Sequence, residues 1–233
     1  MTEKIDYGIT RMTLGDPPFI EIGHKKYLGI LKAVRRLIVG NEIEDLFDVL
    51  IANYVEFEKE VLSIAVEASI LSQSPEQLFD HRSTLARRLT NVMTAARAYR
   101  DQMPSLINDL EADFGKAEFE TLLNEQYDGR FGYRLMEVLR DHAQHVAQPV
   151  DQMTICRRLT DDKRFETSIE ISISRDELLA NKRLKAAFRK EIAQADAKKY
   201  RLLPAVREYM VSCPLFRGHA LKLIASSPRS RLG

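Results

Sequence analysis

The segment from Phe131 to Pro149 gathers side chains that can bind an anion and move protons. It contains Arg140, Asp141, His142 and His145 within six positions. An arginine is always charged and can donate two parallel hydrogen bonds to a phosphate or carboxylate. A histidine has an unperturbed pKa near neutrality, so it can serve as general base or general acid. The residue types therefore suit phosphate binding combined with proton transfer.

A helix over this segment would place the polar groups on one surface. Apolar residues recur at Leu135, Met136, Leu139, Ala143 and Val146, which predicts the buried stripe. The remaining surface then carries five groups that can donate, accept or hold protons: Glu137, Arg140, Asp141, Gln144 and His145.

Spacing along such a helix determines which of these groups could meet. Asp141 lies four residues before His145 and on the same face, where it could orient the imidazole and favour its protonated form. Arg140 and His145 are five residues apart, which is about 140° around the helix axis, too far for an easy shared contact. One helix therefore supplies half of a site.

The spacing of Arg140 and His145, with four residues between them, resembles the R-x(4–6)-H motif of the HEPN family. In that family the residue after the arginine is often Asn, Asp or His, and here it is Asp141. The similarity covers roughly residues 105–215. It includes Tyr-Arg-Leu-Met-Glu-Val-Leu-Arg-Asp-His-Ala-Gln-His, a strand pair, Ile-Ser-Arg-Asp-Glu-Leu-Leu and Leu-Leu-Pro-Ala-Val-Arg-Glu-Tyr-Met, as in a group of bacterial HEPN-like proteins. The first hundred residues match only in helical architecture.

The resemblance implies a metal-independent endoribonuclease that acts as a homodimer, with the active cleft between two protomers. Such chemistry needs a base for the 2′-hydroxyl, a cation beside the phosphorane and an acid for the leaving 5′-oxygen. It implies Arg140, His145 and Asp141 as catalytic residues, with His142, Gln144 and Glu137 as auxiliary candidates. It also implies an RNA substrate, no cofactor, an antitoxin or other regulatory protein as partner, and a role as a toxin or in defence against phage.

Two other interpretations remain open at this point, an unrelated helical protein and a HEPN-like fold without activity. Cations near the last turn of a helix stabilise its dipole, so Arg140 and His145 could be structural. The chain would then be a non-catalytic, HEPN-like helical scaffold that binds a partner protein.

Two long amphipathic helices precede this segment. The apolar spacing predicts one helix from Glu42 to Leu71, with Asn41 as its N-cap, and a second from Ser74 to Pro104. The first is acidic and the second is rich in arginine, which favours an antiparallel pair. A third helix is expected over 105–127, with a break near Gly115, and a fourth from Phe131 to just before Pro149.

The flanking regions have a different pattern. Apolar stretches around Ile5–Ile9 and Phe19–Ile22, separated by Gly15-Asp16-Pro17-Pro18, predict a hairpin or two edge strands, and Lys25–Val39 could be a strand and turn or a short helix. Alternation over 153–159 and 167–173 predicts a second hairpin. Helices are then expected from the Ser174 capping box to about Asp196, and from Leu202 to about Ile224 with a break at Pro214.

The predicted fold is therefore mainly α, an antiparallel HEPN-like four-helix bundle with a small β-hairpin and C-terminal helices. Residues 1–40 form a mixed N-terminal segment, 41–149 the bundle, 150–225 the hairpin and basic helices packed on it, and 226–233 a flexible tail.

The net charge of +1 hides two opposed halves. Residues 175–233 carry 14 Lys and Arg against five Asp and Glu, a net +9, so residues 1–174 carry −8. A basic surface of this kind can hold an RNA backbone, or it can dock on the acidic helix at 42–67. The candidate RNA-binding residues are Lys182, Arg183, Lys185, Arg189 and Lys190.

Several other classes of protein are not expected. The apolar runs are too short to cross a bilayer, and the N-terminus lacks a secretory signal. Cys156 and Cys213 form no CxxC pair, and the five histidines have no zinc-site spacing. We therefore expect a cytoplasmic protein with no membrane contact and no metal.

Overall fold

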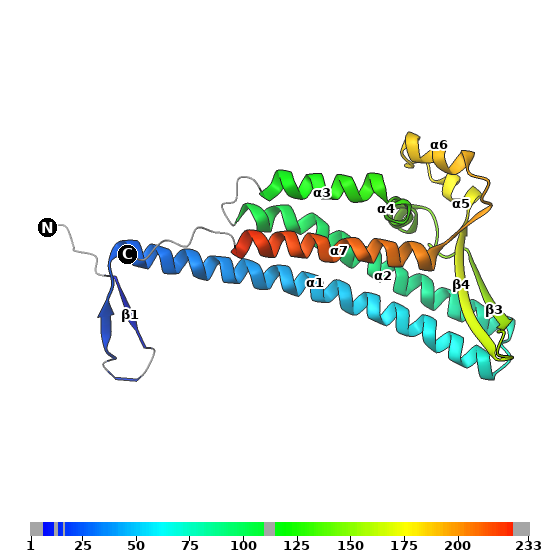
Figure 1. Cartoon of the computed structure of the whole chain (residues 1–233), viewed down its shortest axis with the longest axis horizontal. Helices are drawn as coiled ribbons and strands as arrows, with labels where there is room; N and C mark the ends of the chain where they lie inside the picture. Colours follow the sequence, from blue (N-terminus) through cyan, green and yellow to red (C-terminus); the bar gives the residue numbers. More distant parts are fainter. Residues whose placement is uncertain (1–6, 12–13, 16, 110–114, 226–233) are drawn as a thin grey trace.

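The computed structural model describes residues 7–11, 14–15, 17–109 and 115–225, and it is mainly helical, as predicted. Two small antiparallel sheets accompany the helices (Figure 1). The elements in chain order are β1 (Gly8–Thr10), β2 (Phe19–Glu21), α1 (His24–Ile70), α2 (Pro75–Asn108), α3 (Gly115–Gly129), α4 (Phe131–His145), β3 (Gln152–Leu159), β4 (Phe165–Ser174), α5 (Arg175–Ala180), α6 (Ala186–Gln194), β5 (Lys199–Arg201) and α7 (Leu202–Ala225).

The two longest helices, α1 and α2, run antiparallel along each other, as predicted (Figure 1). The turn between them ends at Ser74, whose hydroxyl accepts from the backbone N–H of Gln77, and the Gln77 side chain accepts from the backbone N–H of Ser74. Pro75 occupies the first helical position. An ion pair between Arg88 and Glu56 joins the two helices, in line with their opposite charges.

Helix α1 is longer than predicted, because it begins at His24 and not after Asn41. Asn41 is therefore an exposed residue within the helix, and the expectation of an N-cap there is wrong. The preceding residues 24–40 contain no proline and continue the apolar repeat, so nothing in them stops the helix. Val39 and Ile43, on either side of Asn41, are fully buried. Their packing stabilises the helix across this position.

Two prolines lie inside helices that the sequence predicted to end or break there. Helix α2 continues through Pro104 to Asn108, so Ser105–Asn108 belong to it and not to the third helix. Helix α7 runs through Pro214 without interruption. In both cases the flanking turns are buried: Met103 and Ile107 around the first proline, Cys213 and Phe216 around the second. Core packing on both sides offsets the hydrogen bond that each proline removes.

Helix α7 packs within the bundle, against both α4 and α1 (Figure 1). Arg207 Nε and Nη2 donate to the two carboxylate oxygens of Glu58, at 2.9 and 2.8 Å. Arg217 contacts Glu44 in a similar way, with a shortest distance of 2.7 Å. Two arginines of the basic C-terminal half thus dock on the acidic helix of the same chain. One hydrophobic core extends from Val39 to Ala220.

The predicted hairpin at 153–173 is present as β3 and β4, and a third strand, β5, extends the sheet. The inward row of β4 is apolar, with Ile169, Ile171 and Ile173 buried. The helix predicted from Ser174 to Asp196 is divided into α5 and α6 by a turn at 181–185. Buried Asn181 causes this break, because its Oδ1 accepts from the backbone N–H of Arg183 at 3.0 Å.

The N-terminal hairpin is also confirmed, with Gly8 opposite Glu21 and Thr10 opposite Phe19. Ile5 and Asp16 of that prediction, and the tail at 226–233, lie outside the described residues.

Candidate functional site

A cleft of about 360 Å³ lies between α2, α3, α4 and the turn that joins α5 to α6. This volume is within the range of small-molecule sites. The cleft is lined by Arg97, Arg100, Leu123, Asn124, Tyr127, Tyr133, Glu137, Val138, Arg140, Asp141, Arg183 and Lys185. Five of these side chains are cationic and two are acidic, so the lining carries a net positive charge.

Helix α4 contributes one of its faces to the cleft. Tyr133, Glu137, Arg140 and Asp141 follow one another at helical spacing, so they lie along the same side. The opposite side of α4 is held in the core by Leu135, Met136 and Leu139, a part of the predicted stripe that is confirmed. Val146, the last member of that prediction, is 46% exposed and does not belong to the stripe.

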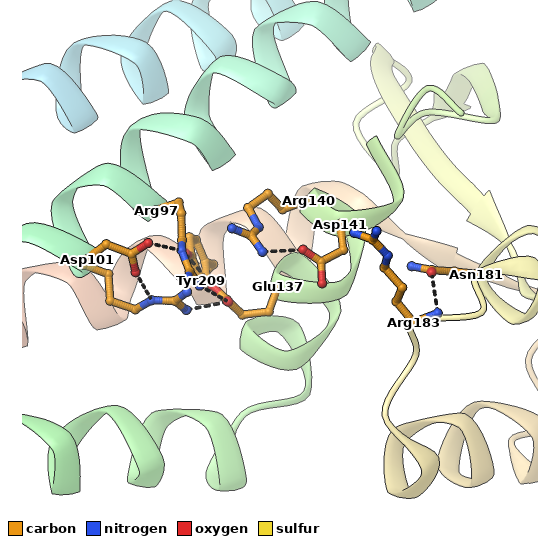
Figure 2. A network of polar contacts seen from close by, with 9 residues as sticks. Arg97, Asp101, Glu137, Arg140, Asp141, Asn181, Arg183 and Tyr209 are labelled. Atoms are coloured by element: carbon orange, nitrogen blue, oxygen red, sulfur yellow. Dashed lines mark hydrogen bonds and ion pairs between the residues drawn. The ribbon is translucent and has the colours of Figure 1, made fainter. Parts of the chain in front are cut away.

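At the inner end of the cleft, Glu137 is the centre of a polar network (Figure 2). It forms an ion pair with Arg100, lies 3.8 Å from Arg97 and accepts a hydrogen bond from the Tyr209 hydroxyl at 3.1 Å. Burial by itself lowers the pKa of Arg100, but the charge and hydrogen bond of Glu137 outweigh it and raise the pKa. Burial raises the pKa of Tyr133 to about 12, and the Glu137 charge adds to the effect. Asp101 also pairs with Arg97 and Arg100, so the two arginines and the two carboxylates of this network are neutral overall.

Arg140 and Asp141 form an ion pair at the middle of the cleft (Figure 2). The Arg140 side chain is 17% exposed, and its Nε atom is buried without a hydrogen-bond partner. The pair leaves this guanidinium with donor capacity that an anion in the cleft could use. Asp141 makes no hydrogen bond with His145 among the described residues, so the structure does not place it as an orienting group for that imidazole.

The outer end of the cleft carries Arg183 and Lys185, both exposed. Figure 2 shows Arg183 reaching from the α5–α6 turn toward Asp141. Lys185 Nζ lies 4.4 Å from the centre of the Tyr127 ring. Neither cation has an ion-pair partner within the described part of the chain. The net positive charge of the cleft therefore lies at its outer end.

His145 and Gln144 lie outside this cleft. Both are exposed at the C-terminal end of α4. The structure therefore separates Arg140 from His145, as expected from their positions around the helix.

His142 was an auxiliary candidate for proton transfer, but it is fully buried, so an exposed position on the helix is excluded. Neither of its ring nitrogens has a hydrogen-bond partner among the residues that the structure describes. Burial lowers its pKa, and the negative charges of Glu177 and Asp151 partly oppose this effect. The reason for the burial is that α4 packs with its Leu139 and His142 side facing inward.

The five basic candidates of the α5–α6 region divide into two groups. Arg183 and Lys185 line the cleft. Arg189 instead donates to the backbone oxygens of Leu179 and Asn181, at 2.7 and 2.6 Å, and so closes the end of α5. Lys182 and Lys190 are exposed and lie outside the cleft lining.

Sequence reasoning missed the contribution of α2 and α3 to the cleft. Arg97 and Arg100 belong to the arginine-rich helix that was expected to pair with the acidic helix, and in the structure they contact Glu137 and Asp101. Their spacing of three residues, which puts both on one helix face, was a usable signal. Tyr127 and Asn124 gave no signal, since their roles depend on how α3 packs against α4.

Among the described residues, no group of three or more His, Cys, Asp or Glu side chains could hold a metal ion. None of the helices described is both long enough and apolar enough to span a bilayer.

Comparison with family models, with curated proteins and with solved structures found no match to this chain.

Proposed function

We propose that this protein binds RNA through the cationic cleft and cleaves it without a metal, with Arg140 as the phosphate-binding cation and His145 as the proton-transfer group. The observation that carries the proposal is the grouping of Arg140, Arg183 and Lys185 around one cleft with Tyr127 at its edge. Phosphates favour cations that have no ion-pair partner, which is the case for Arg183 and Lys185 among the described residues, and Arg140 keeps donors beyond its ion pair with Asp141.

The catalytic part of the proposal depends on the position of the RNA. His145 lies five residues beyond Arg140, a rise of about 7.5 Å along α4. A strand that leaves the cleft along α4 would bring a neighbouring nucleotide toward His145. In this arrangement the cleft anchors the chain, and cleavage takes place beside it.

The binding test compares the affinity of wild-type protein and of Arg183→Ala/Lys185→Ala for a labelled single-stranded RNA. We expect the double substitution to weaken binding by about tenfold or more and to lower the slope of log affinity against log salt by about 1 to 2. Arg158→Ala is the matched control, because Arg158 is an exposed arginine of β3 outside the cleft. Equal affinities for all three proteins would refute the RNA-binding site.

The cleavage test incubates the same RNA with the protein in EDTA. We expect products from the wild type and none from Arg140→Ala or His145→Ala. The Arg140–Asp141 ion pair favours one second candidate, a non-catalytic HEPN-like scaffold, because it keeps the guanidinium occupied. A wild-type protein that neither binds nor cleaves the RNA would select this alternative, a scaffold for a partner protein.

A further inference from the structure

The outer face of α1 carries exposed apolar side chains near both of its ends, and no described part of the chain covers them. These residues, called the outer stripe, are Ile30, Val34, Leu37, Leu62, Val66 and Ile70, and they are between 36% and 75% exposed. At 100° per residue they fall within a sector of about 80°, opposite the buried face of Val39, Phe57 and Ile64. Figure 1 shows α1 as one long edge of the molecule.

The first turns of α1 extend beyond the body of the protein. The body begins near Arg35, which pairs with Asp109 at 2.5 Å, and Val39, the first residue of the core. The described residues before this point have no share in the core, and a short helix without tertiary packing is marginal in water. An exposed apolar face on such a projection indicates an interface.

We propose that a second copy of this chain covers the outer stripe, with the two α1 helices antiparallel. The first argument is symmetry within the stripe. Ile30 and Ile70 lie equally far from residue 50, as do Val34 and Val66. In an antiparallel copy with this register, Ile30 and Val34 of each helix lie opposite Ile70 and Val66 of the other. A two-fold interface requires this kind of self-complementarity.

The second argument is charge. Residues 24–40 of α1 carry five Lys and Arg and no acid, whereas residues 41–70 carry eight acids against Lys59. In the register centred on residue 50, residues 24–40 of one chain lie opposite residues 60–76 of the other, which carry Glu60, Glu67 and Glu76 and no Lys or Arg. Antiparallel packing therefore sets the basic N-terminal end of each α1 beside an acidic segment of the partner, and parallel packing would set the two basic ends together.

The N-terminal hairpin extends the same surface. Figure 1 shows it projecting past the outer edge of α1. Phe19 and Ile20 are 57% and 61% exposed on it, while Leu71 is exposed at the far end of α1. In an antiparallel dimer, the hairpin of one chain lies near Leu71 of the other.

This dimer is independent of the proposed function. The bulk of α2 and α7 separates α1 from α3 and α4 (Figure 1), so the two clefts would remain apart and each protomer would use its own. Failure of RNA binding leaves the dimer unaffected, and the reverse also holds.

The first test is the mass in solution over a range of micromolar concentrations, by light scattering. We expect a dimer, and we expect Leu37→Glu and Val66→Glu each to raise its dissociation constant by about tenfold or more. Val211→Glu is the matched control, since Val211 is an exposed apolar residue of α7. A monomer at all concentrations, or a dimer that resists both substitutions, would overturn the proposal.

The second test measures orientation by disulfide formation in a Cys156→Ser background. A mixture of Val34→Cys and Val66→Cys proteins should cross-link, and neither protein should cross-link with itself. Self-linking of each variant would indicate a parallel pair and overturn the proposal. Sedimentation of a monomeric wild type with anionic vesicles, lost in Leu37→Glu, would show a membrane surface as the occupant instead.

Discussion

At the scale of single residues, the cleft is built from charges that are compensated to different degrees. Glu137 neutralises Arg100 inside, and Asp141 pairs with Arg140 in the middle. At the outer end of the cleft, Arg183 and Lys185 have no ion-pair partner among the described residues. A buried charge is stable only when it is paired, whereas an exposed one is stabilised by water. This gradient from paired to unpaired cations means that an anion would be attracted first by Arg183 and Lys185, and would reach the donors of Arg140 after them.

His142 gives a prediction at this scale. Its pKa is lowered by burial, so below the ordinary histidine pKa of 6.5 the unfolded chain binds a proton that the folded protein resists. The free energy of unfolding should therefore decrease as the pH falls from about 7.5 to 5.5. Replacing His142 by leucine should reduce this decrease, as measured by urea unfolding at several pH values.

The control for this experiment is His145→Gln, because the His145 side chain is exposed in the folded protein. An unchanged pH dependence in His142→Leu would show that the buried imidazole does not contribute to it.

At the scale of elements, the packing of α4 against α7 determines that the polar face of α4 lines the cleft. Gly132 allows this approach. Its N–H donates to the Glu208 carboxylate at 2.7 Å, and a Cβ at this position would collide with that carboxylate and lie 3.0 Å from the Ala205 Cα. The absence of a side chain therefore fixes the start of α4 on α7.

We expect Gly132→Ala to lower the free energy of unfolding by about 1 to 3 kcal/mol, because either the carboxylate or the helix must move. Thermal or urea unfolding followed by circular dichroism measures this change. Gly129→Ala is the matched control, since a Cβ there meets no atom within 4 Å, and its effect should stay within about 0.5 kcal/mol. Equal stability of the two variants would contradict the proposed contact.

At the scale of the whole molecule, the opposite net charges of residues 1–174 and 175–233 stabilise the folded chain through ion pairs between them. Arg207 and Arg217 of α7 bind Glu58 and Glu44 of α1, so part of the basic C-terminal charge is used within the chain. The core that these contacts enclose begins at Val39 and ends at Ala220. The N-terminal projection lies outside it.

Removal of residues 1–33 should therefore leave the body folded. At a concentration where the protein is monomeric, we expect the thermal midpoint to change by less than about 3 °C, since none of the deleted residues that the structure describes belongs to the core. Loss of cooperative unfolding in the truncated chain would show that the projection supports the body.

The sequence by itself determined the helical class, the α1–α2 pair, the Ser74 cap and both hairpins, because periodicity and capping are local signals. It also identified Arg140, Asp141, Glu137, Arg183 and Lys185, which the structure brings to one cleft. Only the tertiary structure decided that α1 begins at His24 and that α2 and α7 pass through their prolines, since burial there overrides the local preference.

The tertiary structure also separated His145 from Arg140, buried His142, and added Arg97, Arg100 and Tyr127 to the cleft. These outcomes depend on which helix faces meet across segments far apart in the chain. The spacing of residues along one helix determines which side chains lie on each face. The packing of the helices determines what each face contacts.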